Sequence, residues 1–180
     1  LKSSIPAGSL VIVLGGPAML IGLGGGAASS MGSGAGSIEL DFASVQRENA
    51  EMQRRCQEVI NTCINDGDNL IEFIHDVGAG GLSNAIPELA KDTGLGVEIE
   101  YDSIPKADKS LSPMELWCNE SQERYVIAIN SNSLKEFAEI CNRERCPFAV
   151  VGKTTLNKDV ILSSSSLQET YIDLPLSMLF

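Results

Sequence analysis

Short apolar runs bounded by glycine, proline or polar residues predict a series of β-strands along the chain. We expect these strands over 9–14, 70–73, 97–101, 125–129, 148–151, 160–162 and 171–174. The 97–101 run alternates apolar and acidic residues, which is typical of a strand with one face in water. The 70–73 strand is expected to lie centrally and the 171–174 strand at an edge. The 148–151 and 160–162 runs are expected to form a hairpin.

Apolar residues recur at helical spacing between these runs and predict four helices. We expect them over 49–66, 83–91, 112–117 and 133–146. The inward stripe of the first is expected to comprise Met52, Cys56, Val59, Ile60, Cys63 and Ile64. Asn49 can cap this helix, and Ser112 and Ser133 each open a capping box with glutamate three residues later. Pro87 is expected in or near the first turn of its helix, or at a kink.

Strands and helices alternate, though not strictly, and the end of the chain is rich in strands. This order predicts a mixed α/β (α+β) fold, in which helices pack in layers on a mixed β-sheet. The 180 residues, 43% of them hydrophobic, are enough for one buried core, so we expect a single domain over 1–180. Because the chain starts at Leu1 and its first strand follows closely, we expect it to be a piece of a longer protein.

Charge and cysteine content exclude several classes of protein. A formal net charge of -11 argues against binding to nucleic acid or to an anionic membrane surface. No apolar run approaches the ~20 residues of a membrane span, and no signal pattern opens the chain, so we expect a cytoplasmic location. Five cysteines without a C-x-x-C pair argue against a disulfide framework or a zinc ribbon. We expect Cys56 and Cys63 to be core thiols.

A strand-to-helix turn at 74–82 carries the first candidate site. Asp76 follows an apolar run, and Gly78, Gly80 and Gly81 follow Asp76. A carboxylate at a strand end, with glycines that let backbone N–H groups approach a ligand, suits a Mg²⁺-bound phosphate. The alternative is that the glycines only form a tight turn and that Asp76 caps the following helix.

A second stretch, 15–36, is dominated by small residues and predicts a mobile or ligand-ordered loop. The spacing of Gly22, Gly24 and Ala27 matches a dinucleotide-binding fingerprint, but later glycines would break the helix that such a site requires. A phosphate-binding Walker loop around Lys153 also fails, because Pro147 replaces its first glycine. The loop therefore stays a candidate ligand contact without a nucleotide-binding fold around it.

A third stretch, 118–124, places polar side chains directly before the apolar strand at 125–129. It can be a ligand-binding turn. The residues alone favour a solvated turn with an ion pair at Arg124.

These three stretches, read together, resemble one family. The matching residues are 15–30, 73–84 and 115–124, in that order, and the likeness continues to the 173–176 ending. They look like the large, single-chain phosphoribosylformylglycinamidine synthases. The resemblance implies the C-terminal-type α/β domain of the first of two repeats, each of which is similar to aminoimidazole ribonucleotide synthetase.

The resemblance also implies the chemistry. These enzymes are ATP-dependent C–N ligases of purine biosynthesis that convert formylglycinamide ribonucleotide, ATP and glutamine to formylglycinamidine ribonucleotide, ADP, phosphate and glutamate. The implied route phosphorylates the substrate amide oxygen, and channelled ammonia then displaces the phosphate. The implied partners are a half-barrel ATP-binding domain, a second repeat and a glutaminase domain of the same enzyme, so this chain alone is expected to be inactive.

Residue roles follow from the same resemblance. Asp76 is the implied Mg²⁺ ligand at the ATP, and His75 orients its motif with the help of Gly78, Gly80 and Gly81. The implied substrate-binding residues are Gly24, Gly25, Gly26, Ala27, Glu120, Ser121 and Gln122. The alternative function is a non-catalytic scaffold that packs against the second repeat.

Overall fold

The computed structural model describes residues 5–21, 49–65 and 69–180, and these residues form a seven-stranded sheet. Its strands are β1 (Leu10–Gly15), β2 (Ile71–Asp76), β3 (Gly96–Glu100), β4 (Arg124–Ile129), β5 (Phe148–Thr155), β6 (Asp159–Ser164) and β7 (Glu169–Pro175). Their order across the sheet is β2-β4-β1-β5-β3-β6-β7. The β3–β6 pair is parallel and the other pairs are antiparallel, so the prediction of a mixed sheet is confirmed.

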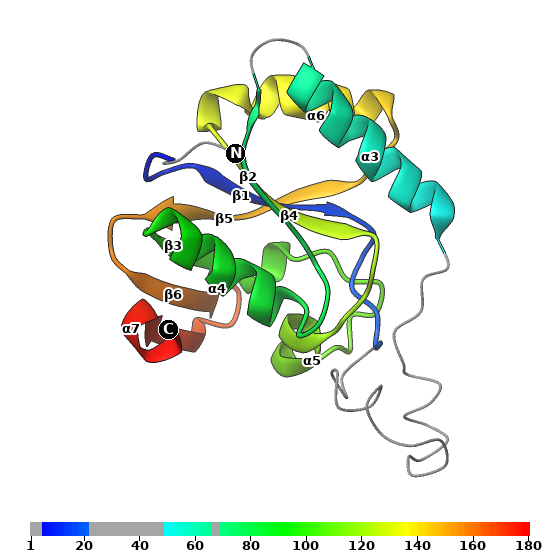
Figure 1. The fold of residues 1–180 in the computed structure, drawn as a ribbon. Helices are drawn as coiled ribbons and strands as arrows, with labels where there is room; N and C mark the ends of the chain where they lie inside the picture. Colours follow the sequence, from blue (N-terminus) through cyan, green and yellow to red (C-terminus); the bar gives the residue numbers. More distant parts are fainter. Residues whose placement is uncertain (1–4, 22–48, 66–68) are drawn as a thin grey trace, which may run out of the picture.

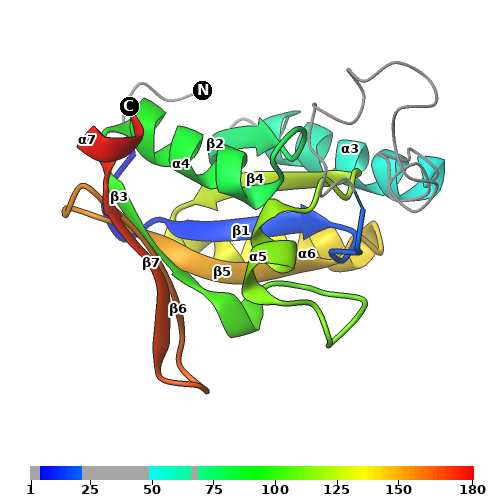
Figure 2. The same cartoon turned by 90° about the horizontal axis from the view of Figure 1, so that it is seen from below.

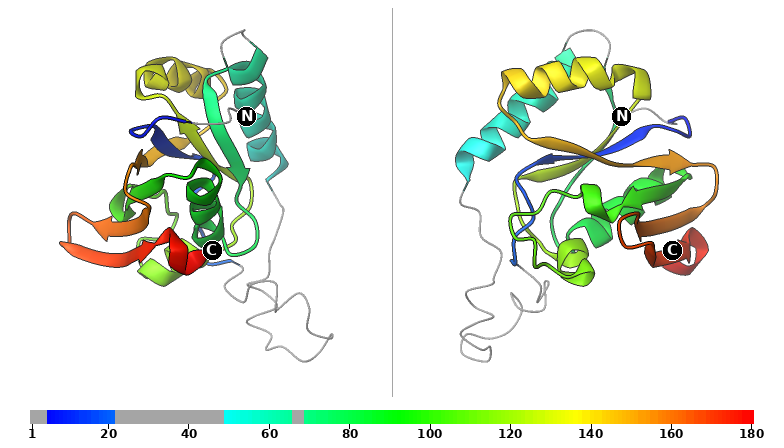
Figure 3. Two further views of the ribbon diagram at one scale, coloured as in Figure 1. Left: turned by 60° about the vertical axis from the view of Figure 1, so that its left-hand side comes forward. Right: turned by 180° about the vertical axis from the view of Figure 1, so that it is seen from behind.

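Helices cover both faces of this sheet (Figures 1 and 3). They are α3 (Ala50–Asn65), α4 (Leu82–Thr93), α5 (Pro113–Cys118), α6 (Leu134–Arg143) and α7 (Leu176–Leu179), with 3-10 turns at Tyr101–Ser103 and Ser131–Ser133. The pair α3 and α6 lies on one face, while α4, α5 and α7 lie on the other, toward the viewer in Figure 2. In the described ranges, no helix combines the length and apolar character that crossing a bilayer requires.

The layered arrangement gives the sheet two separate cores. Within β1, Ile12 and Leu14 pack toward α3 and α6, whereas Val11 and Val13 pack into the cluster with α4 and α5. All four side chains are at most 1% exposed. A strand that is buried on both faces reads as a continuous apolar run, which is why β1 and β4 show little alternation in the sequence.

The first predicted helix forms as α3, and Asn49 caps it by accepting a hydrogen bond from the N–H of Met52 at 2.9 Å. Cys56 and Cys63 are buried on its inward face, as expected of core thiols. The prediction for Ile64 is wrong, because its side chain is 49% exposed. Cys63 takes the inward position in the last turn, and a helix rotates the next residue about 100° away from that face.

Two predictions of strand position are also wrong. The strand before the Asp76 turn lies at an edge of the sheet as β2. The 148–151 and 160–162 runs form no hairpin, because β3 inserts between β5 and β6. Gly96 makes this insertion possible, since a Cβ there would lie 1.7 Å from the carbonyl oxygen of Asn157 in the β5–β6 connection. The edge position predicted for 171–174 is confirmed in β7.

The two predicted capping boxes differ in outcome. Ser112 and Glu115 form theirs at the start of α5, with a proline at the first position. Ser133 makes no side-chain cap, because it ends a 3-10 turn in a helical conformation. Pro87 lies inside α4, where its missing N–H leaves one carbonyl of the preceding turn without its helical partner.

Phe137→Ala is expected to lower the free energy of unfolding of the chain by about 3–5 kcal/mol, because it removes a fully buried ring. The ring of Phe137 packs edge-on against Phe148 with 5.5 Å between centroids. Denaturant unfolding measures the change. Lys135→Ala, on the exposed face of α6, is the matched control and should shift stability by no more than about 0.5 kcal/mol. Equal losses in the two variants would contradict this core assignment.

Candidate functional site

Three strand ends meet at one end of the sheet and carry the three sequence motifs. In the β1–β4 ladder Gly15 lies opposite Arg124, and in the β2–β4 ladder Asp76 lies opposite Tyr125. Because β4 runs antiparallel to both neighbours, its first residues face the last residues of β1 and β2. The segments that begin at Gly15, follow Asp76 and precede Arg124 are therefore neighbours in space, although they are far apart in the sequence.

The glycine turn after Asp76 is fixed by backbone hydrogen bonds. The N–H of Val77 donates to the carbonyl of Arg124 at 3.0 Å, and the N–H of Gly81 donates to the carbonyl of Gly78 at 3.0 Å. Gly80 and Gly81 have φ of 77° and 62°, in the left-handed region. The helix α4 starts without a side-chain cap, so the alternative that Asp76 caps it is wrong.

Glu120 and Ser121 lie inside this end of the molecule, at 3% and 1% exposure. The Glu120 carboxylate accepts a hydrogen bond from the N–H of Gly80 at 2.9 Å. The Ser121 hydroxyl accepts from the N–H of Met19 at 2.9 Å and donates to the Met19 carbonyl at 3.2 Å. These two side chains tie the third motif to the other two, and the expectation of a solvated turn is wrong.

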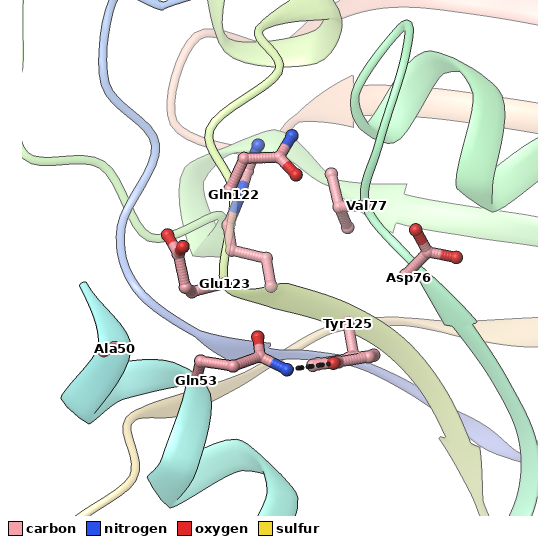
Figure 4. A pocket seen from close by; sticks show the side chains of 8 residues that line it. Ala50, Gln53, Asp76, Val77, Gln122, Glu123 and Tyr125 are labelled. Carbon is pink, nitrogen blue, oxygen red and sulfur yellow. Dashed lines mark hydrogen bonds between the residues drawn. The ribbon is translucent and has the colours of Figure 1, made fainter. Parts of the chain in front are cut away.

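A pocket of about 440 Å³ opens between α3, the end of β2 and the start of β4 (Figure 4). It is lined by Ala50, Gln53, Asp76, Val77, Gln122, Glu123, Arg124 and Tyr125. Gln122 donates from its side-chain nitrogen to the Glu120 carbonyl at 2.8 Å, while the Asp76 side chain is 77% exposed. Tyr125 and Gln53 are joined across the pocket wall by a 2.9 Å hydrogen bond. Among the lining side chains, Asp76 and Glu123 carry carboxylates, and Gln53 and Gln122 carry amides.

His75 joins the Asp76 turn to α4. Its Nδ1 lies 2.6 Å from the Asp76 carbonyl oxygen, and its Nε2 lies 2.5 Å from a carboxylate oxygen of Glu88. A carbonyl oxygen can only accept, so Nδ1 carries the hydrogen in this arrangement. The ring therefore holds the backbone beside Asp76, a geometry compatible with the orienting role implied for His75.

Arg124 is the residue that sequence reasoning missed. It is 1% exposed, and its guanidinium donates to carbonyl oxygens of Asn119 and Ser121 instead of forming the expected ion pair. Burial away from water lowers the pKa of Arg124 from 12.5 to about 10, so the side chain is still charged at pH 7. An arginine directly before a wholly apolar strand is the one sequence signal that could have indicated its burial.

The sequence of the chain matches a known family. The family model described as AIR synthase related protein, C-terminal domain, matches residues 6–163. The chain belongs to this family. A phosphoribosylformylglycinamidine synthase of Schizosaccharomyces pombe is 58% identical over 179 residues, which are 99% of the chain and 14% of that relative. The chain thus spans about one seventh of the relative's length, and the resemblance read from the sequence is confirmed over that part.

Solved structures support the same fold for this AIR synthase-related domain. Thermotoga maritima PurL complexed with FGAR superposes with a TM-score of 0.82 at 22% identity, covering 99% of the chain and 29% of that structure. Thermotoga maritima PurL complexed with ATP gives a TM-score of 0.79 at 19% identity, covering 99% and 27%. At these identities the likeness shows the shared layered fold.

Four residues expected to bind the substrate, Gly24, Gly25, Gly26 and Ala27, lie outside the described residues.

Gly15 holds the first segment against the third. Its φ is 112°, and a Cβ there would lie 2.1 Å from the carbonyl oxygen of Glu123. The described ranges contain no group of three His, Cys, Asp or Glu side chains arranged to hold a metal ion. Asp76 is thus the exposed carboxylate that the glycine turn presents.

The cysteines of the domain take no visible part in the pocket. Cys56, Cys63, Cys141 and Cys146 are buried, Cys118 is half-buried, and all five are free thiols. The contact with the Cys146 thiol, 3.6 Å away, and burial raise the pKa of Cys56 well above its usual range. Such a thiol is a poor nucleophile at neutral pH.

Gly81→Ala is expected to destabilise the domain by at least about 3 kcal/mol, because strain at positive φ adds to a steric clash. A Cβ at Gly81 would lie 2.1 Å from the carbonyl oxygen of Asn119. The matched control is Gly94→Ala at the end of α4, where φ is 69° but nothing lies within 4 Å of the new Cβ. The control should lose only about 1 kcal/mol, from backbone strain alone. Equal losses in thermal or denaturant unfolding would show that the two turns are not packed as described.

Proposed function

We propose that this chain is the C-terminal-type α/β domain of the first repeat in a phosphoribosylformylglycinamidine synthase. In that role it takes part in the conversion of formylglycinamide ribonucleotide, ATP and glutamine to formylglycinamidine ribonucleotide, ADP, phosphate and glutamate. The observation that carries the proposal is the 58% identity to the Schizosaccharomyces pombe enzyme over 99% of the chain. The pocket between α3 and the second and third motifs supports it, since ligands bind in clefts with a few convergent polar groups.

The three polar residues of the third motif share the substrate-binding role unequally. Gln122 lines the pocket and keeps its side-chain oxygen available as an acceptor, because its hydrogen bond to the Glu120 carbonyl uses the nitrogen. The side chains of Glu120 and Ser121 are hydrogen-bonded to backbone groups of Gly80 and Met19, respectively. In this proposal Gln122 contacts the substrate directly, while Glu120 and Ser121 hold the turns around it. The backbone of 24–27 approaches the ribose phosphate of the substrate.

Asp76 is proposed to hold the Mg²⁺ of the catalytic ATP. Its carboxylate is exposed at the pocket and offers the hard oxygen ligand that this ion prefers. A single carboxylate fits the ion when phosphate oxygens and water supply the other ligands. When bound, the ion supplies neutralisation of phosphate charge during phosphoryl transfer. The protein residues contribute by position: His75 holds the backbone of Asp76, and the glycine turn leaves the carboxylate exposed at the pocket that Gln122 also lines.

The remaining parts of the reaction belong to other domains of the same enzyme in this proposal. A half-barrel domain binds most of the ATP, a second repeat packs against this one, and a glutaminase domain supplies ammonia from glutamine. The enzyme acts in the cytoplasm in purine biosynthesis. Among the described residues, the pocket lining holds two carboxylates, Asp76 and Glu123, and no cluster of basic side chains, which supports this division.

A non-catalytic scaffold role is the second candidate. One observation favours it: Glu120 and Ser121 are almost fully buried and bonded to the backbone, as purely structural residues would be. The two proposals differ in what they expect of the exposed Asp76 and Gln122 side chains. A scaffold requires neither.

Asp76→Ala in the full-length enzyme is expected to lower the rate of formylglycinamidine ribonucleotide formation by about 100-fold or more, the scale of losing one electrostatic contact in a transition state. Thermal unfolding should be unchanged, because the side chain is exposed. Asp92→Ala, an exposed aspartate near the end of α4, is the matched control and should keep full activity. Normal turnover in Asp76→Ala, with altered stability, would support the scaffold instead.

The isolated 180-residue chain is expected to show no detectable amidation with ATP, formylglycinamide ribonucleotide and ammonium. Mg²⁺ requires several oxygen ligands, and the pocket contributes only the carboxylates of Asp76 and Glu123 without the rest of the nucleotide site. An assay for formylglycinamidine ribonucleotide measures this, with the full-length enzyme as the positive control. Turnover by the isolated chain that disappears in Asp76→Ala would show that it carries a complete site.

A further inference from the structure

Arg124 is bonded in a way that the stability of the fold does not explain. Its Nε donates to the Ser121 carbonyl at 2.9 Å, and its Nη2 donates to the carbonyl and side-chain oxygens of Asn119 at 3.1 and 2.9 Å. All three acceptors are neutral, and Nη1 is buried without a hydrogen-bond partner. A buried charge with neutral acceptors and one unsatisfied group is costly, and an apolar side chain of similar size often serves a fold as well or better.

The bonds of Arg124 converge on the turn that carries Gln122. Asn119 and Ser121 precede Gln122, and the guanidinium donates hydrogen bonds to the carbonyls of both. Glu123, between Gln122 and Arg124, has φ of 56°, a left-handed conformation that is strained for a residue with a side chain. Such strain persists only where the surroundings fix it, and tends to occur at functional sites. The guanidinium is the side chain that closes this turn from within.

The backbone of Arg124 acts on the second ligand turn. Its carbonyl accepts from the N–H of Val77, the residue after Asp76. The Asn119 carbonyl, which Arg124 binds, also lies against Gly81 so closely that no Cβ fits there. Arg124 therefore adds to the Glu120–Gly80 hydrogen bond in fixing the spacing between the Gln122 turn and the Asp76 turn.

We propose that Arg124 is a positioning residue that sets the Gln122 amide at the ligand pocket through its bonds to Asn119 and Ser121. The inference rests on the proposed function, because it takes formylglycinamide ribonucleotide as the ligand of the pocket. The planar guanidinium is required for this role: a lysine ammonium keeps the charge but cannot present donors to Asn119 and Ser121 in the same fixed fork.

A double-variant cycle in the full-length enzyme tests the inference. Gln122→Ala should raise KM for formylglycinamide ribonucleotide about 10-fold, the scale of one lost hydrogen bond. Arg124→Lys should raise KM by a similar factor with kcat unchanged, because the lost interaction serves binding. The double variant should resemble the single ones, since both changes remove the same contact. Arg54→Lys, at an exposed ion pair with Glu58 on α3, is the matched control and should leave KM unchanged.

Each outcome decides between a positioning role and other roles. Independent, multiplying effects in the double variant would overturn the inference, because Arg124 would then not act through Gln122. An Arg124→Lys enzyme with unchanged KM would overturn it as well, because the fork of donors would then not be needed for binding. So would failure of both the Arg124→Lys and the Arg124→Gln enzyme to fold, since the residue would then serve the fold alone. A Gln122→Ala enzyme with unchanged KM, by contrast, would contradict the proposed function and not the bonding role of Arg124.

Discussion

The register of β4 against β1 and β2 is the constraint on which the site depends. It places Gly15 beside Arg124 and Asp76 beside Tyr125, so that three loops leave the sheet at the same end. Two of the contacts between these loops are too close for a Cβ, at Gly15 and at Gly81. A slip of one residue would turn every β4 side chain to the other face of the sheet and would separate the motifs.

The sheet can hold this register because both of its faces are buried. Side chains of β1 and β4 pack alternately into the core under α3 and α6 and into the core with α4 and α5. A strand buried on both sides loses apolar contacts on either face if it shifts, so register is strongly specified in the middle of the sheet. The glycine turns can then take strained conformations at the rim, where the packed layers fix their ends.

Local patterns predicted the elements well and their spatial order poorly. The Asn49 cap and the Ser112 capping box each depend on neighbouring residues, and the structure confirms them. The edge position of β2 and the insertion of β3 depend on pairings between distant segments, which periodicity does not encode. The burial of Arg124 was missed for the same reason, because its partners become visible only when the turn before β4 closes over it.

A crystal structure of the full-length enzyme with formylglycinamide ribonucleotide and a non-hydrolysable ATP analogue with Mg²⁺ would test the central claim most directly. The account predicts that the ribonucleotide lies within hydrogen-bond distance of the Gln122 side chain and that the Asp76 carboxylate contacts the metal ion. Both contacts should form with the backbone bonds of Glu120 and Ser121 intact. Ligands bound elsewhere, with Asp76 and Gln122 still facing solvent, would contradict it.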